Sequence, residues 1–251
     1  MQNNDNNLAG KVVLITGAAQ RIGAAIARHL HAGGMNVVLH CRTSRAAADA
    51  LARELNALRA QSCAVVQGDL LDSHDLVRVP AEAVQAWGRL DVLVNNASTF
   101  HATPVGTVTD GQWDDLLGTN LKAPFFLAQA LAGELRKRQG CIVNIVDIHA
   151  EHPLKSYPVY SIAKAGLAMM TKSLARELGP EVRVNGVAPG AILWPEHEMS
   201  EKATAQIIAR TALKRQGHPE DIARAVLFLV RDADYMTGEI ITIDGGRSLS
   251  I

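Results

Sequence analysis

Short apolar runs alternate with amphipathic stretches along nearly the whole chain. The runs are rich in Val, Ile and Leu without a polar alternation, which is typical of strands buried on both faces of a parallel sheet. They predict strands over 12–16, 36–40, 63–67, 91–95, 141–146, 182–188 and 239–243. Apolar residues at helical spacing predict helices near 21–33, 44–60, 72–87, 111–138, 158–179 and 219–231.

This alternation predicts right-handed βαβ units and a definite fold class. We expect an α/β protein with a single doubly wound Rossmann-type domain and a seven-stranded parallel sheet, over 11–251, after a flexible polar tail at 1–10. The longest connection, about 189–217, leaves the carboxyl end of a strand, where ligands bind in such sheets. A connection of this length is typical of a lid or a substrate loop.

Composition narrows the classes of function. The 25 Lys and Arg residues balance 25 Asp and Glu residues, so we expect binding neither to nucleic acid nor to an anionic membrane. No apolar run reaches the roughly 18 residues of a membrane span, and the Asn-rich start does not resemble a signal peptide, which favours a cytoplasmic protein. Cys41, Cys63 and Cys141 lie in or beside apolar runs, which predicts buried thiols and no metal site.

The first predicted strand leads into a glycine turn, from Thr16 to Gly23, and then into a helix. Glycines such as Gly17 would let the main chain approach a pyrophosphate at the helix N-terminus, although an ordinary turn has glycines too. Arg21 favours the pyrophosphate, because a cation in the first helical turn opposes the helix dipole unless an anion is bound there. Ile22 belongs to the same predicted cofactor segment.

The end of the second strand indicates which dinucleotide binds. An NAD enzyme usually places Asp or Glu there for the ribose 2′-hydroxyl. This chain instead has His40, Arg42, Thr43 and Ser44. A guanidinium with hydroxyls suits a 2′-phosphate, which predicts NADPH/NADP+, and a solvated basic patch is the alternative.

The third strand ends at Asp69 and Leu70, which we also assign to the cofactor. Asp69 would receive the adenine amino group or, equally, cap the helix that follows.

Tyr160 and Lys164 lie four residues apart in the helix predicted at 158–179 and therefore share one face. A nearby ammonium stabilises tyrosinate and would lower the pKa of the phenol, which makes Tyr160 a usable proton donor near neutral pH. Such a pair is common in helices, so its setting decides its meaning.

That setting is a series of short motifs in a fixed order. They are Asn95-Asn96-Ala97-Ser98, Gly118-Thr119-Asn120, Pro189-Gly190, Tyr235-Met236-Thr237-Gly238 and Asp244-Gly245-Gly246. With Tyr160 and Lys164, they make the chain closely resemble the short-chain dehydrogenase/reductase family over about 11–249.

The resemblance implies roles for the matching positions. Tyr160 would donate the proton, Lys164 would hold the nicotinamide ribose, and Asn120 would anchor a water in the proton relay. The positions expected to line the cofactor are Asn96, Ala97, Ser98, Gly190 and Ile192. The helices near 111–138 and 158–179 would pack against a partner subunit, giving a homotetramer.

Two positions depart from the usual family pattern. Arg21 stands where a glycine is usual, and Asp147 stands thirteen residues before Tyr160, where a serine is usual. Both departures resemble the pteridine reductases, as do Ser98 and Phe100. This resemblance implies that Phe100 stacks on a pterin ring. It also implies that Arg21 and Ser98 bind polar edges of the pterin and the cofactor phosphates, with Asp147 serving a substrate nitrogen.

Other interpretations of these residues stay open. Asp147 would alternatively do no more than bond to neighbouring main chain, and a lone Phe after a strand is often part of a core. Leu193 and Trp194 would wall the substrate pocket, although Trp194 is equally explained as a core anchor. We expect an NADPH-dependent reductase of a small pterin or folate. A reductase of a ketone, such as a 3-oxoacyl thioester, and a non-catalytic NADPH-binding sensor are the alternatives.

Overall fold

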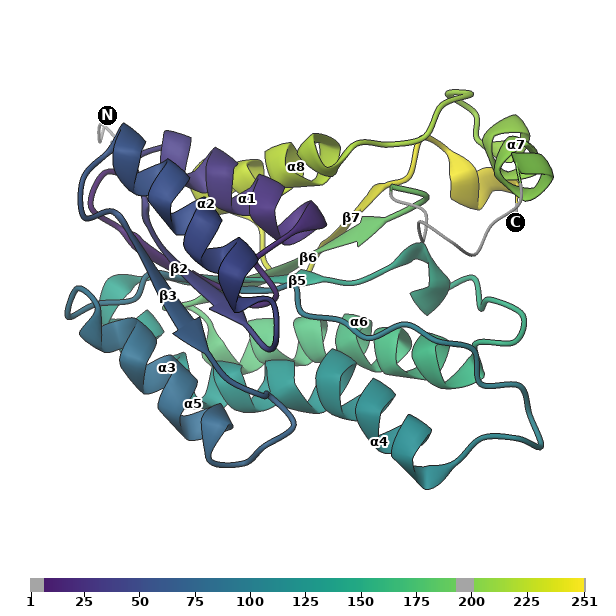
Figure 1. Ribbon diagram of the computed structural model, residues 1–251, viewed down its shortest axis with the longest axis horizontal. Coiled ribbons are helices and arrows are strands. Elements are labelled where there is room, and N and C mark those ends of the chain that lie inside the picture. The colour runs from purple at the N-terminus through teal and green to yellow at the C-terminus, as the bar shows by residue number, and fades with distance from the viewer. Residues whose placement is uncertain (1–6, 193–200, 251) are drawn as a thin grey trace.

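The computed structural model describes residues 7–192 and 201–250, with side chains from residue 204 onward in the second range. Its seven strands form one parallel sheet in the order β3-β2-β1-β4-β5-β6-β7 (Figure 1). The strands are β1 (Val12–Ile15), β2 (Asn36–Cys41), β3 (Cys63–Gln67), β4 (Val92–Asn95), β5 (Cys141–Ile145), β6 (Arg183–Pro189) and β7 (Ile240–Ile243). The predicted fold class and sheet are confirmed.

Helices cover both faces of the sheet (Figure 1). One layer holds α1 (Arg21–Ala32), α2 (Arg45–Leu58) and α8 (Pro219–Arg231). The other layer holds α3 (Asp75–Gln85), α4 (Asp110–Leu117), α5 (Ala123–Arg138) and α6 (Pro158–Leu178). None of the helices in the described part of the chain is both long and apolar enough to cross a membrane.

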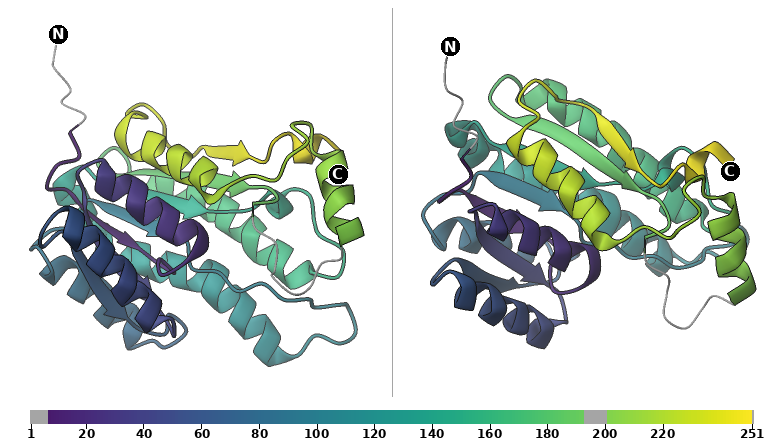
Figure 2. Two further views of the ribbon diagram at one scale, coloured as in Figure 1. Left: turned by 45° about the horizontal axis from the view of Figure 1, so that its top comes forward. Right: turned by 90° about the horizontal axis from the view of Figure 1, so that it is seen from above.

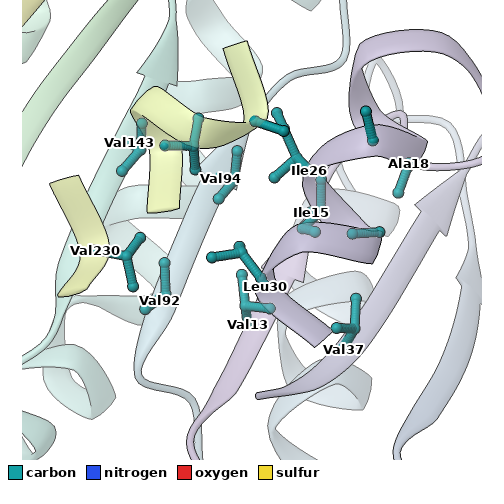
Figure 3. Close-up of a cluster of buried hydrophobic side chains, with 14 of the residues drawn as sticks. Val13, Ile15, Ala18, Ile26, Leu30, Val37, Val92, Val94, Val143 and Val230 are labelled. Carbon is teal, nitrogen blue, oxygen red and sulfur yellow. The ribbon is translucent and has the colours of Figure 1, made fainter. Parts of the chain in front are cut away.

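The core between the sheet and the first layer consists mainly of aliphatic side chains (Figure 3). Ile26 and Leu30 of α1 pack over Val13 and Ile15 of β1, and Val230 of α8 lies beside them, all buried. Because every residue of β1 is buried, its sequence is a continuous apolar run and not an alternating one.

The order of the strands reverses at β1, which pairs with β2 on one side and with β4 on the other. Val13 is the register partner of both Val37 and Val92. In open parallel sheets, ligands bind outside the carboxyl ends of the strands at such a reversal. The glycine turn after β1 and the segments after β4 and β5 all leave from this edge.

Three local predictions need correction. The helix expected at 111–138 is present, but a π-helical turn over Gly118–Lys122 divides it into α4 and α5. The connection at 189–217 contains α7 (Glu201–Arg210). The tail at 1–10 was expected to be flexible throughout, but Leu8 is buried in the core, because an apolar side chain is stabilised by leaving water.

The three cysteines are buried and free, as predicted. Burial disfavours the charged thiolate and raises the pKa of all three thiols, that of Cys63 to about 12. They contribute apolar volume to the core and are poor nucleophiles.

Candidate active site

The turn between β1 and α1 is built for close approach of the main chain. Gly17 has a φ of +62°, and a Cβ there would lie 2.9 Å from Ala97 Cα. A Cβ on Gly23 would lie 2.4 Å from Gly17 O, so helix α1 can pack this tightly only with glycine. Ile22 packs against the buried apolar side chains of the core that β1 and α1 share.

Arg21 adopts a left-handed conformation, with a φ of +54°, at the first position of α1. This conformation favours glycine, which explains why a glycine is usual at this position of the family pattern. The Arg21 side chain is exposed at the helix N-terminus. The strained main chain therefore carries a long cationic side chain at the predicted phosphate site.

Hydrogen bonds from the segment that follows β4 hold this turn in place. Thr16 Oγ1 accepts the main-chain N–H groups of Asn96 and Ala97, each at 2.9 Å. The Asn96 side-chain amide donates to the carbonyl oxygens of Thr16 and Gly17, at 2.9 and 3.0 Å. Asn96, predicted to line the cofactor, thus also braces the turn that would hold it.

His40 is buried at the end of β2 and bridges two loops. The Gly17 N–H donates to its Nδ1 at 3.3 Å, and Nε2 lies 3.1 Å from Gly68 O. Because Nδ1 accepts, the proton must be on Nε2. Burial lowers the pKa of His40, so the ring is neutral at physiological pH. With both nitrogens engaged inside the protein, His40 would influence a cofactor through the turn.

The other predicted cofactor residues surround the same edge. Arg42 and Thr43 are exposed and Ser44 is half-buried at the start of α2, where its side chain makes no capping hydrogen bond.

In the segment that follows β3, Asp69 Oδ1 accepts the Leu71 N–H at 3.0 Å. Asp69 therefore shapes the turn before α3 and does not occupy its N-cap position, which is held by His74 without a side-chain capping hydrogen bond. Leu70 is buried.

The predicted catalytic residues meet at the start of α6. The Tyr160 hydroxyl donates to Asp147 Oδ2 at 2.8 Å, and Lys164 Nζ donates to Ile145 O at 2.9 Å. Asp147 Oδ1 accepts the His149 N–H at 2.8 Å and so caps a short 3₁₀ turn, Ile148–Ala150. Asp147 therefore does more than bond to neighbouring main chain, since its second carboxylate oxygen accepts from Tyr160, and its role toward a substrate nitrogen stays a prediction.

The electrostatics of Tyr160 differ from the sequence-based expectation. We expected Lys164 to lower the pKa of the phenol, whereas burial first, and then the Asp147 carboxylate, raise it well above its usual value. Burial also lowers the pKa of Lys164 to about 8, against an opposing effect of Asp147. The sequence pattern failed here because it does not show that both side chains are removed from water beside a carboxylate.

Asn120 lies in the π-helical turn between α4 and α5. Its Oδ1 accepts from Ser98 Oγ at 2.6 Å, and its Nδ2 donates to Leu116 O at 2.9 Å and to Thr99 O at 3.0 Å. Single π turns inside helices are often found at functional sites. The turn thus links the segment after β4 to the helix layer beside Tyr160.

Aromatic side chains form one wall of the site. Phe100 is 46% exposed and is not a core residue. It stacks on Tyr157, with ring centroids 4.5 Å apart, and lies edge-on to Tyr160 at 4.8 Å. Sequence reasoning missed Tyr157, which is the N-cap residue of α6 and lies just outside the helix.

The sixth strand ends close to the seventh. A Cβ on Gly190 would lie 2.5 Å from Asp244 Cβ, and the Gly190 N–H donates to Ile243 O at 3.0 Å. Ile192 is buried. Leu193 and Trp194, predicted to wall the substrate pocket, lie outside the described residues.

A glycine turn at the reversal of strand order, with a buried Tyr–Lys pair two strands away, is the arrangement of a dinucleotide-dependent oxidoreductase. Comparison with known proteins agrees. The family model described as enoyl-(acyl carrier protein) reductase matches residues 17–248. The chain belongs to the short-chain dehydrogenase/reductase family.

Two curated relatives are similar over almost their whole length. Pteridine reductase 1 of Leishmania tarentolae is 38% identical, with 95% of this chain and 96% of the relative covered. A 3-oxoacyl-[acyl-carrier-protein] reductase of Thermotoga maritima is 37% identical, with 95% and 98% covered. A metagenomic blue fluorescent protein in complex with NADPH superposes with a TM-score of 0.90 at 33% identity, covering 96% of this chain and 99% of that chain.

Proposed function

We propose that this oxidoreductase reduces a pteridine, of the dihydrobiopterin, dihydromonapterin or dihydrofolate type, with NADPH. The observation that carries the proposal is the hydrogen bond of 2.8 Å between Tyr160 and the Asp147 carboxylate, at a position where the family usually has a serine. A C=N bond accepts hydride far better once its nitrogen is protonated, and a carboxylate beside the phenol would stabilise such a protonated nitrogen, which a ketone does not have.

The residues present fit NADPH. The cradle at Gly17 and Gly23 leaves no room for a Cβ, as a main chain that approaches a pyrophosphate requires. Arg42 and Thr43 are exposed at the end of β2, where they would hold a 2′-phosphate. Bound there, NADPH would supply the hydride. Lys164 would reach the nicotinamide ribose from α6.

The chain would deliver the proton through Tyr160 and Asp147. The high pKa of Tyr160 keeps its proton on the phenol until a substrate nitrogen accepts it. Lys164 Nζ lies 5.6 Å from the centroid of the Tyr160 ring, where its charge would stabilise tyrosinate after the transfer. Phe100 and Tyr157 would provide the aromatic face for a flat ring.

One observation favours a second candidate, the reduction of a 3-oxoacyl thioester. The Thermotoga maritima relative named for that reaction is 37% identical, almost the same as the pteridine reductase. The hydrogen bond that holds the Tyr160 phenol against Asp147 suits proton transfer and disfavours a non-catalytic NADPH-binding sensor. Any turnover by the wild type that is lost in Tyr160→Phe would exclude the sensor.

Asp147→Ser is the first prediction, and it separates the two substrates. Serine caps helical turns as well as aspartate does, so the His149 contact survives while the carboxylate is lost. We expect kcat/KM for dihydrobiopterin to fall by about 10²-fold or more, since a side chain positioned for proton transfer contributes this much. The kcat/KM for an acetoacetyl thioester, measured with the same preparations, should fall less or rise.

Asp232→Ser is the matched control. Asp232 is ion-paired with Arg231 at the far end of α8, and its loss should leave both values unchanged. A wild-type enzyme that reduces the thioester and ignores every pterin would show that the second candidate is correct.

A further inference from the structure

Arg247 begins a short 3₁₀ turn, Arg247–Ser250, a few residues after β7. In the part of the chain that the structure describes, two buried side-chain atoms lack a hydrogen-bond partner, Asn95 Oδ1 and Arg247 Nη1. A buried donor without a partner is costly, and in a native protein it usually marks a place that an ion, a water or a ligand fills. A guanidinium is also always charged, so its missing partner is best supplied by an anion.

The charges around Arg247 are positive. Burial first, and then the charge of Arg210 at the end of α7, lower the pKa of the Arg247 guanidinium. The carboxylate nearest in sequence is that of Asp244. Both of its oxygens already accept hydrogen bonds within the turn, from the N–H groups of Gly246 at 2.8 Å and Ser248 at 2.7 Å. Within the described residues, no carboxylate forms an ion pair with Arg247.

This turn lies beside the segment that follows α7 (Figure 2). The Leu213 N–H donates to Gly245 O at 3.0 Å. Arg247 also lies on the same edge of the sheet as the catalytic residues. A small cavity of about 60 Å³ has both Asp147 and Ser248, the neighbour of Arg247, in its lining.

We propose that Arg247, with Arg210 beside it, binds the anionic end of the substrate's side chain, so that a pterin with a carboxylate-bearing tail, of the folate type, is the preferred substrate class. This inference rests on the proposed function for the identity of the ring. A planar guanidinium binds a carboxylate through two parallel hydrogen bonds.

The test is the ratio of kcat/KM for dihydrofolate to that for dihydrobiopterin, which lacks a carboxylate tail. We expect Arg247→Gln to lower this ratio by about ten- to a hundred-fold, chiefly through the KM for dihydrofolate. Arg247→Lys keeps the charge and should restore part of the ratio. The control Arg231→Gln removes an arginine already paired with Asp232 and should leave the ratio unchanged.

Competition on the wild type provides a measurement that does not depend on a variant's folding. We expect N-(4-aminobenzoyl)glutamate to inhibit dihydrofolate reduction at lower concentrations than uncharged 4-aminobenzamide, and increasingly so at low salt. Equal inhibition by the two compounds would overturn the proposal. An unchanged ratio in Arg247→Gln would overturn it as well.

The failure of the proposed function gives a different result. A wild type that reduces no pterin overturns the pteridine assignment and, with it, the folate-type substrate class. The wild type and Arg247→Gln would then be compared on acetoacetyl-coenzyme A and on a small neutral ketone. A loss of turnover only with acetoacetyl-coenzyme A would support the anion subsite, with a phosphate as its ligand.

Discussion

Asp147 shows how one residue serves structure and chemistry at the same time. One oxygen caps the 3₁₀ turn after β5, and this bond fixes the carboxylate so that the other oxygen meets Tyr160. A side chain held in this way cannot rotate away from the phenol without breaking the cap. The usual serine would also cap the turn, but it would bring no negative charge to the buried pair.

The buried Lys164 predicts a pH dependence. Its pKa is lowered to about 8, so the ammonium is charged below that pH and loses its charge as the pH rises through it. If the charge holds the cofactor and stabilises tyrosinate, kcat/KM for NADPH should be level below pH 8 and fall above it, by about tenfold per pH unit. A pH–rate profile measured from pH 6 to pH 10 would show this.

The phenol of Tyr160 should not titrate within this pH range, because its pKa is raised well above its usual value of 10. Lys164→Arg keeps a positive charge at every pH in this range and should shift the fall to higher pH, whatever its overall activity. A wild-type profile that stays flat to pH 10 would contradict the role of the lysine charge.

Contacts between residues far apart in the chain could not be predicted from the sequence. Tyr160 and Lys164 were found because helical spacing puts them on one face and the motifs around them resemble those of the family. His40 bridges Gly17 and Gly68, and the pKa of Tyr160 is raised where a lowered value was expected. Both effects depend on burial and on contacts between segments far apart in the chain. No local pattern encodes them. The side-chain contact of Tyr157 with Phe100 was missed for the same reason.

At the scale of elements, the sheet was predictable and the helix layer less so. A strand buried on both faces is a continuous apolar run, which is easy to recognise. The π-helical turn at Gly118–Lys122 interrupts a helix without interrupting its helical sequence pattern, so 111–138 was predicted as one helix. Helix α7 was missed because the predicted connection was treated as a loop throughout.

The glycine turn and α1 provide a prediction at this scale. A Cβ on Gly23 would meet Gly17 O at 2.4 Å and Asn96 Nδ2 at 2.7 Å, so Gly23→Ala must push the turn away from the helix. We expect a loss of about 1–3 kcal/mol in the free energy of unfolding and a raised Kd for NADPH. Denaturant unfolding and a fluorescence titration of NADPH would measure these effects.

Gly111→Ala is the matched control, because a Cβ at Gly111 in α4 would have no heavy atom within 4 Å. Alanine there should leave the Kd for NADPH unchanged and the stability equal or slightly higher. If Gly23→Ala behaved like Gly111→Ala, the close approach of the turn to the helix would not matter for binding.

At the scale of the whole molecule, large apolar side chains are exposed on neighbouring helices. They are Trp113 on α4, Phe125 and Phe126 on α5, and Ile162 and Met169 on α6, exposed by between 39 and 62%. Exposed apolar side chains gathered on one layer mark interaction surfaces. We propose that this layer forms the interface of the homotetramer expected from the family resemblance.

Phe125→Asp tests this interface. A buried charge opposite its own copy across a symmetric contact should split the assembly, so light scattering after size exclusion should show a smaller species than the wild type. Leu58→Asp on α2, in the opposite layer and 75% exposed, should keep the wild-type mass. A wild-type monomer, or a variant of unchanged mass, would contradict the proposed interface.

The hydrogen bonds that Thr16 accepts from Asn96 and Ala97 have a consequence for how the chain acquires its function. They join segments 80 and 81 residues apart, so the turn for the dinucleotide is braced only after β4 has docked beside β1. A nascent chain that ends before this strand would hold the glycine sequence but not its shape. Dinucleotide affinity therefore reports completed folding of this half of the sheet, and the bound cofactor stabilises the folded state by mass action.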